Sequence, residues 1–273
     1  MLHALRADAA QLVLFCDEGA GVAARLASHF AMPIEVRAVV GDTSVAAQPD
    51  PLPVVPPPPV GVEDLLAQLR THGLEVVAEE GSWRGELLGL EIARLVLWPT
   101  ETGGDGEYHL EAGVGRFDRD AAAAMHEGET PEAGLQRAVR IVSERRHRGA
   151  TTHPLSLLSR SRWLRSDAAA DPAVVGAVSL ESVQTAYPPD SVREDPPAAA
   201  IATDADGSQF VVVFGAGAGL DLVPVAADTR AMYAPDGRLL LVVPPKDHLR
   251  VTGELAAQLT GDVGIVDLEP GWA

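Results

Sequence analysis

The sequence predicts an α/β fold in which a mixed sheet is flanked by helices and the chain is divided into two lobes. The chain has 273 residues, of which 47% are hydrophobic and 22% charged, so it can bury a sizeable core. Strand-like and helix-like stretches alternate towards its C-terminal end, the pattern of parallel strands covered by helices. Residues 167–197 are rich in proline and acidic residues and separate the two lobes.

The first 60 residues predict a small βαβ unit followed by a linker. Strands are expected over 12–15 and 34–40, with a helix over 21–30 between them. Residues 49–59 contain seven prolines, which exclude a helix or a central strand. This segment is therefore expected to be an extended Pro-rich loop.

A helix and three strands are expected next. Val62, Leu65, Leu66 and Leu69 have the spacing of an amphipathic helix, and Gly73 is a suitable C-cap residue. The expected strands cover 74–78, 86–97 and 108–115, and further helical stretches are expected over 120–125, 130–146 and 153–164.

The rest of the chain predicts the second lobe. Strands and helices are expected over 199–203, 210–214, 222–232, 238–243, 251–259 and 263–267, with one strand-like stretch over 177–183 before them. We expect an N-terminal domain over 1–165 that includes the loop 49–59, a linker over 166–197, and a C-terminal ββαβαβ lobe over 198–273.

Composition excludes several classes of protein. The net charge of −18 disfavours nonspecific binding of nucleic acid by the molecule as a whole. The first residues lack the basic start and long apolar centre of a signal peptide, and the apolar run over 210–220 is shorter than the roughly 20 residues that cross a bilayer. Cys16 is the only cysteine, which excludes an intrachain disulfide. An acidic, cytoplasmic protein without membrane contact is expected, and the overall style of the sequence resembles that of bacterial families.

Three glutamates form the first candidate site. Glu86 and Glu91 fall on one expected strand and Glu111 on the next. A helix followed by three strands, with acids on the second and third, resembles the restriction-endonuclease-like fold of the PD-(D/E)xK superfamily over residues 62–146. The resemblance implies that Glu86 or Glu91, together with Glu111, binds Mg²⁺ for phosphodiester hydrolysis.

The chain departs from that pattern where the superfamily has a lysine, two residues after the second acid. Gly113 stands there, and Lys246, the only lysine, lies far away in sequence. The resemblance therefore indicates a degenerate core. In the other interpretation, the glutamates are ordinary strand carboxylates that are exposed or paired with arginines, for which the candidates are Arg84, Arg94, Arg116 and Arg119. Residues 199–230 resemble the same superfamily in shape alone, with Phe214 and Ala216 in the positions of acid and lysine.

A glycine-rich turn forms the second candidate site. Gly215, Gly217 and Gly219 follow an expected strand and precede an expected helix, where backbone N–H groups can hold the phosphate of a nucleotide-type ligand. Asp221 would place a negative charge beside that phosphate, and the next strand does not end in the acid that binds a ribose. The alternative interpretation is a tight turn between strand and helix.

An arginine cluster forms the third candidate site. Between residues 137 and 165 there are eight arginines and one acid, Glu144. The arginines are Arg137, Arg140, Arg145, Arg146, Arg148, Arg160, Arg162 and Arg165. They could pair with the acids of the chain, form a contact between domains or subunits, or bind an anionic partner or nucleic acid, with Trp163 as a stacking surface.

The sequence is therefore compatible with three functions, and it leaves open whether the protein is an enzyme. The first is a non-catalytic interaction or scaffold protein on a degenerate nuclease-like fold, without a cofactor, whose contact surface is the 137–165 segment. The second is a nuclease or phosphoesterase that uses Glu86, Glu91 and Glu111 with Mg²⁺. The third is a nucleotide-type ligand binder at Gly215 to Gly219.

Overall fold

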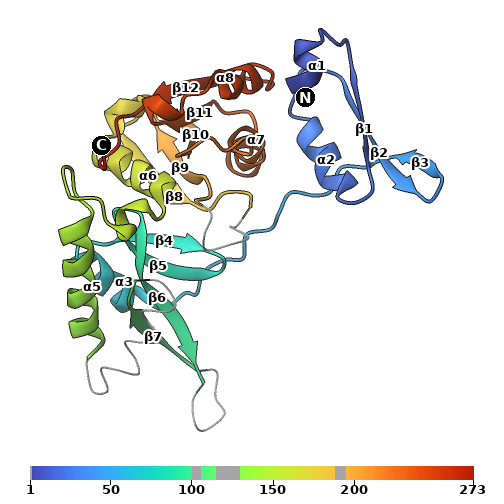
Figure 1. Ribbon diagram of the computed structural model, residues 1–273. Coiled ribbons are helices and arrows are strands. Elements are labelled where there is room, and N and C mark those ends of the chain that lie inside the picture. The colour runs from blue at the N-terminus through green and yellow to red at the C-terminus, as the bar shows by residue number, and fades with distance from the viewer. Residues whose placement is uncertain (1, 100–105, 115–129, 188–194) are drawn as a thin grey trace.

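The computed structural model describes residues 2–99, 106–114, 130–187 and 195–273. Figure 1 shows three β-sheets with helices packed around them. The sheets have three, four and five strands in chain order, and this arrangement confirms the predicted α/β class. In the described part of the chain, no helix combines the length and apolar composition that crossing a membrane requires.

Residues 2–46 form the N-terminal unit. It contains α1 (Leu2–Arg6), β1 (Leu12–Cys16), α2 (Ala20–Ala27), β2 (Ile34–Val40) and β3 (Thr43–Ala46). The predicted βαβ arrangement is confirmed, since β1 and β2 are parallel. The antiparallel strand β3 and the short helix α1 were not expected from the sequence. Residues 47–62 then contain no helix or strand, as their prolines predict.

The second sheet is an antiparallel meander in the order β4-β5-β6-β7. Its strands are β4 (Glu75–Glu79), β5 (Ser82–Leu87), β6 (Leu90–Trp98) and β7 (Glu107–Ala112), and its helices are α3 (Glu63–Thr71) and α5 (Pro131–Arg145). Thr130 caps α5 by accepting a hydrogen bond from the Ala133 N–H. The apolar faces of α3 and α5 form one core with Leu90, Ile92 and Leu110.

The prediction of a single strand over 86–97 is wrong. Glu86 is the second-last residue of β5 and Glu91 is the second residue of β6, and the two strands are joined by a hairpin turn at Leu88 and Gly89. Both turn residues have positive φ, 49° and 72°, as a two-residue turn of type I′ requires. A leucine at the first position hides this turn, because asparagine or aspartate usually marks it in a sequence. The helix expected over 120–125 lies outside the described residues.

The third sheet has the order β12-β11-β10-β9-β8 and forms the C-terminal lobe with three helices. Its elements are α6 (Arg160–Ala170), β8 (Ser179–Val183), β9 (Ala198–Thr203), β10 (Gln209–Phe214), α7 (Leu222–Tyr233), β11 (Leu239–Val243), α8 (Arg250–Ala256) and β12 (Val263–Asp267). Strands β10, β11 and β12 are parallel, whereas β8 and β9 are antiparallel to their neighbours.

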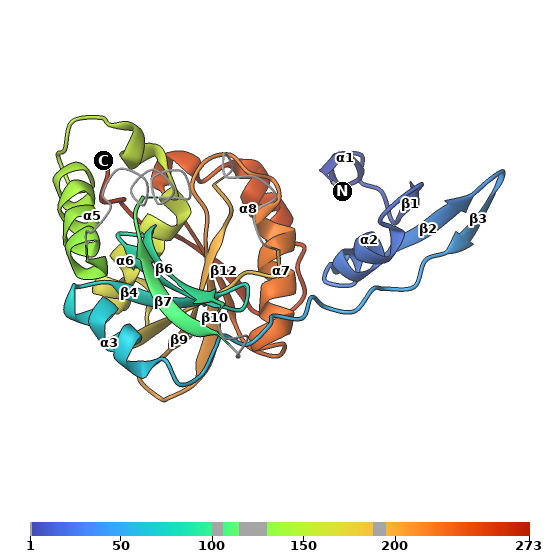
Figure 2. The ribbon, with the colours of Figure 1, turned by 90° about the horizontal axis from the view of Figure 1, so that it is seen from below.

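Helices cover both faces of this sheet (Figure 2). Successive residues of β10, such as Val211 and Val212, are buried in different cores, one shared with α7 and α8 and the other with α6. Burial on both faces explains the continuous apolar runs of β10 and β11. The 166–197 segment, expected as a linker, contains the end of α6 and the edge strand β8 in its described part. The helical stretch expected over 153–164 is divided between a short 3₁₀ turn, Pro154–Leu157, and the start of α6.

Candidate functional site: a buried cluster of glutamates and arginines

One face of the four-stranded sheet carries charged side chains on β4 and β5. Glu75, Glu79, Arg84 and Glu86 share this face, because alternate residues of a strand point the same way and Glu75 is paired with Glu86 across the sheet. Helix α6 meets this face with the side chains of its arginines, and the resulting cluster is almost entirely removed from solvent.

Glu86 lies at the centre of the cluster and is only 1% exposed. Its Oε1 accepts a hydrogen bond from Arg162 Nη1 at 2.5 Å, and its Oε2 accepts one from Arg165 Nη2 at 2.6 Å. Arg162 also donates through Nη2 to Glu79, at 2.6 and 2.8 Å. Two guanidinium groups therefore occupy both oxygens of the Glu86 carboxylate.

The charges in this cluster shift one another's ionisation. Burial raises the pKa of Glu86, and the guanidinium groups of Arg162 and Arg165 oppose that shift. Burial alone would lower the pKa of Arg162, but Glu86 and Glu79 raise it above its ordinary value. The cluster thus keeps Arg162 charged in the interior of the protein.

Glu91 is held by arginines of the sheet itself. It lies opposite Glu86 in the register of β5 and β6, and Arg84 lies opposite Arg94. Like charges in directly opposite positions repel, so the favourable contacts are the diagonal and local ones. Arg94 donates to the Glu91 carboxylate from Nε and Nη2 at 3.0 Å each, and Arg84 Nη1 lies 3.3 Å from it. Arg84 also pairs with Glu79 and Glu80.

Glu111 stands apart from the buried cluster. It lies on β7, opposite Arg94, and accepts a hydrogen bond from Trp98 Nε1 at 3.2 Å. Gly113 follows β7, whereas Lys246 lies in a short turn after β11 of the other sheet. Among the residues that the structure describes, no three His, Cys, Asp or Glu side chains are grouped so that they could hold a metal ion.

The three predicted glutamates occupy three successive strands, β5, β6 and β7. The expected pattern of acids on the second and third strands after the helix therefore applies to Glu86 and Glu91. The lysine position, two residues after the second acid, then falls on Ala93, which is fully buried. Neither this assignment nor the one through Glu111 supplies an ammonium group.

The arginines expected to form a patch are divided between the interior and the surface. Arg146 is 0% exposed, donates to the carbonyl oxygens of Leu155, Leu158 and Leu88 at 2.6–2.7 Å, and lies 4.2 Å from the centre of the Trp163 ring. Its burial lowers the pKa of Arg146 to about 10.

Arg162 and Arg165 are also interior side chains, so they cannot contact an external partner in this conformation. Arg137 and Arg160 are half-buried, and Arg140, Arg145 and Arg148 are exposed. Trp163, expected as a stacking surface, is buried between Arg146 and Trp272.

The glycine-rich turn joins β10 to α7, as expected. The N–H of Gly217 donates to the Asp247 carboxylate at 2.8 Å, and the N–H of Ala216 donates to Ser161 Oγ at 3.1 Å. These are the groups that a bound phosphate would use. In this conformation an internal carboxylate occupies one of them.

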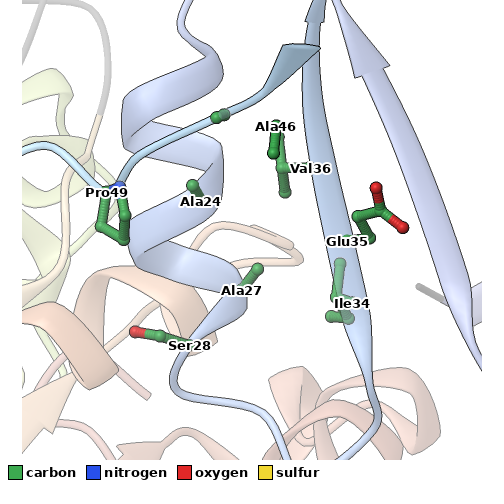
Figure 3. Close-up of a pocket in the computed structure, with 9 residues that line it drawn as sticks. Ala24, Ala27, Ser28, Ile34, Glu35, Val36, Ala46 and Pro49 are labelled. Atoms are coloured by element: carbon green, nitrogen blue, oxygen red, sulfur yellow. The ribbon is translucent and has the colours of Figure 1, made fainter.

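A shallow pocket of about 290 Å³ lies on the N-terminal unit between α2 and strands β2 and β3. Figure 3 shows mainly small apolar side chains around it, and the carboxylate of Glu35 points away from Ala24 and Ala27. The pocket offers Ser28 as its polar side chain on the helix and brings together no groups suited to catalysis.

Known proteins offer no guide to this site. No family model, curated protein or solved structure matches the chain.

Proposed function

We propose that this protein is a non-catalytic interaction protein whose sheet keeps the layout of a nuclease core while arginines occupy the carboxylate centre. The observation that carries this proposal is the position of Glu86, whose two oxygens are each bound by a different arginine of α6. Metal-dependent hydrolysis needs carboxylate oxygens that are free to bind the ion, and it needs space for substrate beside them. The buried Glu86 offers neither.

The cluster instead joins two parts of the molecule. Glu86 and Glu79 belong to the four-stranded sheet, and Arg162 and Arg165 belong to a helix of the C-terminal lobe. A buried, multiply paired charge network fixes one relative position of the two sheets, because any other position would leave charges unpaired in the interior. This is the role expected of a scaffold.

The contact surface that we propose is the exposed part of the 137–165 segment. Arg140, Arg145 and Arg148 lie on α5 and the turn after it, and all three are exposed. In a protein of net charge −18, such a local positive surface favours an anionic partner, most simply an acidic segment of another cytoplasmic protein.

Catalysis is tested by incubating wild-type protein with DNA and Mg²⁺ or Mn²⁺, beside Glu111→Ala as the matched variant. The proposal expects no cleavage by either protein. Cleavage by the wild type that is absent in Glu111→Ala would establish the nuclease instead.

The surface is tested by reversing its charge. Arg145→Glu combined with Arg148→Glu should weaken binding to an acidic polypeptide such as polyglutamate, and added salt should weaken the wild-type interaction. Arg250→Glu reverses the charge of one exposed arginine of α8, outside this surface, and serves as the control beside the two reversals made on it. Equal binding by wild type and both variants would refute this surface.

A further inference from the structure

The N-terminal unit stands apart from the other two sheets. Figures 1 and 2 both show residues 2–46 beside the C-terminal lobe, joined to the remaining chain by the extended segment after β3. The unit has its own three-stranded sheet and packs α2 against it. Its contacts with the lobe come mainly from α1 and from the end of α2.

The strongest of these contacts is a buried charge cluster around Asp228, which we name the Asp228 cluster. Asp228 lies on α7 and is 0% exposed. Its carboxylate accepts hydrogen bonds from Arg25 Nε at 3.1 Å, His29 Nε2 at 2.7 Å and the Tyr187 hydroxyl at 2.6 Å. Arg25 and His29 belong to the N-terminal unit, so two of the three partners leave if the unit moves away.

Arg25 also ties the cluster to the Pro-rich segment. Its Nη1 donates to the carbonyl oxygens of Asp50 and Pro51, at 3.2 and 2.7 Å, and its Nη2 donates to the Tyr187 hydroxyl. The guanidinium group of Arg25 thus connects the N-terminal unit to the start of the Pro-rich segment and to the C-terminal lobe.

A short antiparallel bridge completes the contact. Phe30 is paired with Leu259, and two backbone hydrogen bonds flank the pair: Ala31 N–H to Gln258 O at 2.7 Å and Thr260 N–H to His29 O at 2.8 Å. Phe30 packs against the core of the lobe but is only partly buried there.

We infer that the N-terminal unit opens and closes against the C-terminal lobe as one body, with the Pro-rich segment 47–62 as its tether and the Asp228 cluster as its fastening. Three features carry this inference: the unit has its own sheet, the joining segment has no regular structure, and, among the described residues, the hydrogen bonds between unit and lobe lie in the Asp228 cluster and one short bridge. The inference is independent of the proposed function. Opening would expose the surface of α7 around Asp228 to solvent and to partners.

Amide hydrogen exchange on the full-length protein tests this device. Arg25→Ala removes one partner of a buried charge pair, so protection of the Ala31 and Thr260 amides should fall by about a hundredfold or more. The amides of β11 should keep wild-type protection, because the lobe stays folded while the unit opens. Arg37→Ala is the matched control, since that arginine pairs with Glu35 and Ser44 inside the unit, and it should change neither set of amides.

A disulfide provides the reverse experiment. Phe30 and Leu259 face each other in the bridge, at a separation typical of residues that a disulfide can join. For this experiment, Phe30→Cys and Leu259→Cys are added to a variant that carries Arg25→Ala and Cys16→Ser. Oxidation to the disulfide should restore the protection of the two bridge amides that Arg25→Ala removes, and reduction should abolish that protection again. Equal loss of protection in β11 and the bridge would refute the inference, because unit and lobe would then unfold together. Unchanged protection of the bridge in Arg25→Ala would refute the role of the Asp228 cluster.

Discussion

Replacing Glu86 by alanine should destabilise the protein far more than replacing Glu111 by alanine. Glu86 accepts one charge-assisted hydrogen bond from Arg162 and one from Arg165. Such bonds contribute about 1.5–3 kcal/mol each, so the pair contributes about 3–6 kcal/mol. The cost of removing one partner of a buried ion pair, about 3–5 kcal/mol, has the same size. We therefore expect Glu86→Ala to lower the free energy of unfolding by about 3–5 kcal/mol.

Urea denaturation followed by far-UV circular dichroism measures this loss. The midpoint of unfolding should fall by about 1 M or more, given slopes of about 1–3 kcal/mol per molar urea. Glu111→Ala is the control, because within the described part of the chain that carboxylate accepts one hydrogen bond, from the exposed Trp98, and its midpoint should stay close to that of the wild type. If Glu86→Ala were no less stable than Glu111→Ala, the buried cluster would not join the two sheets as argued.

The other predictions concern the turn, the surface and the N-terminal unit. Gly89→Ala should lower the free energy of unfolding by about 3 kcal/mol or more, since the added Cβ would lie 2.2 Å from the backbone of Arg162 at a φ of +72°. In the same urea assay, Gly176→Ala should lower it by only about 1 kcal/mol, because Gly176 has a similar φ of +74° but its Cβ would meet open space. Combined Arg145→Glu and Arg148→Glu should leave the urea midpoint unchanged, and a marked fall would place those side chains in the interior. Hydrogen bonds from His29 and Tyr187 and the charge of Arg25 lower the pKa of Asp228 below the ordinary aspartate value of 3.8, in spite of its burial. The charged Asp228 therefore favours the docked state, and amide exchange should show docking that persists as pH falls to about 3.8 and is lost below it. In the Asp228→Asn variant the N-terminal unit should dock weakly at every pH. Undocking of the wild type near neutral pH would contradict the role of the Asp228 carboxylate.

Much of the fold could be predicted because its signals are local. The apolar runs of β10 and β11 predict strands buried on both faces, and the structure places helices on both faces of their sheet. The turn at Leu88 and Gly89 was missed because its first residue is not one that usually adopts positive φ. That single turn moved Glu86 and Glu91 onto different strands.

The buried cluster could not be predicted, because its partners are distant in sequence. Arg162 and Arg165 lie 76 and 79 residues from Glu86 and reach it only through the packing of α6 on the sheet. Local partners were within reach of the sequence, and the pairing of Arg84 and Arg94 with Glu91 was among the expected alternatives. The sequence signal for Asp228 is a lone acid within the apolar helix Leu222–Tyr233.

The proposed function requires that the arginines on Glu86 leave no carboxylate oxygen free for a metal ion. Isothermal titration of the wild-type protein with Mn²⁺ tests it most directly, with Glu86→Gln as the matched variant that keeps the size of the side chain. Neither protein should give saturable heat. A stoichiometric binding isotherm for the wild type that disappears in Glu86→Gln would contradict it.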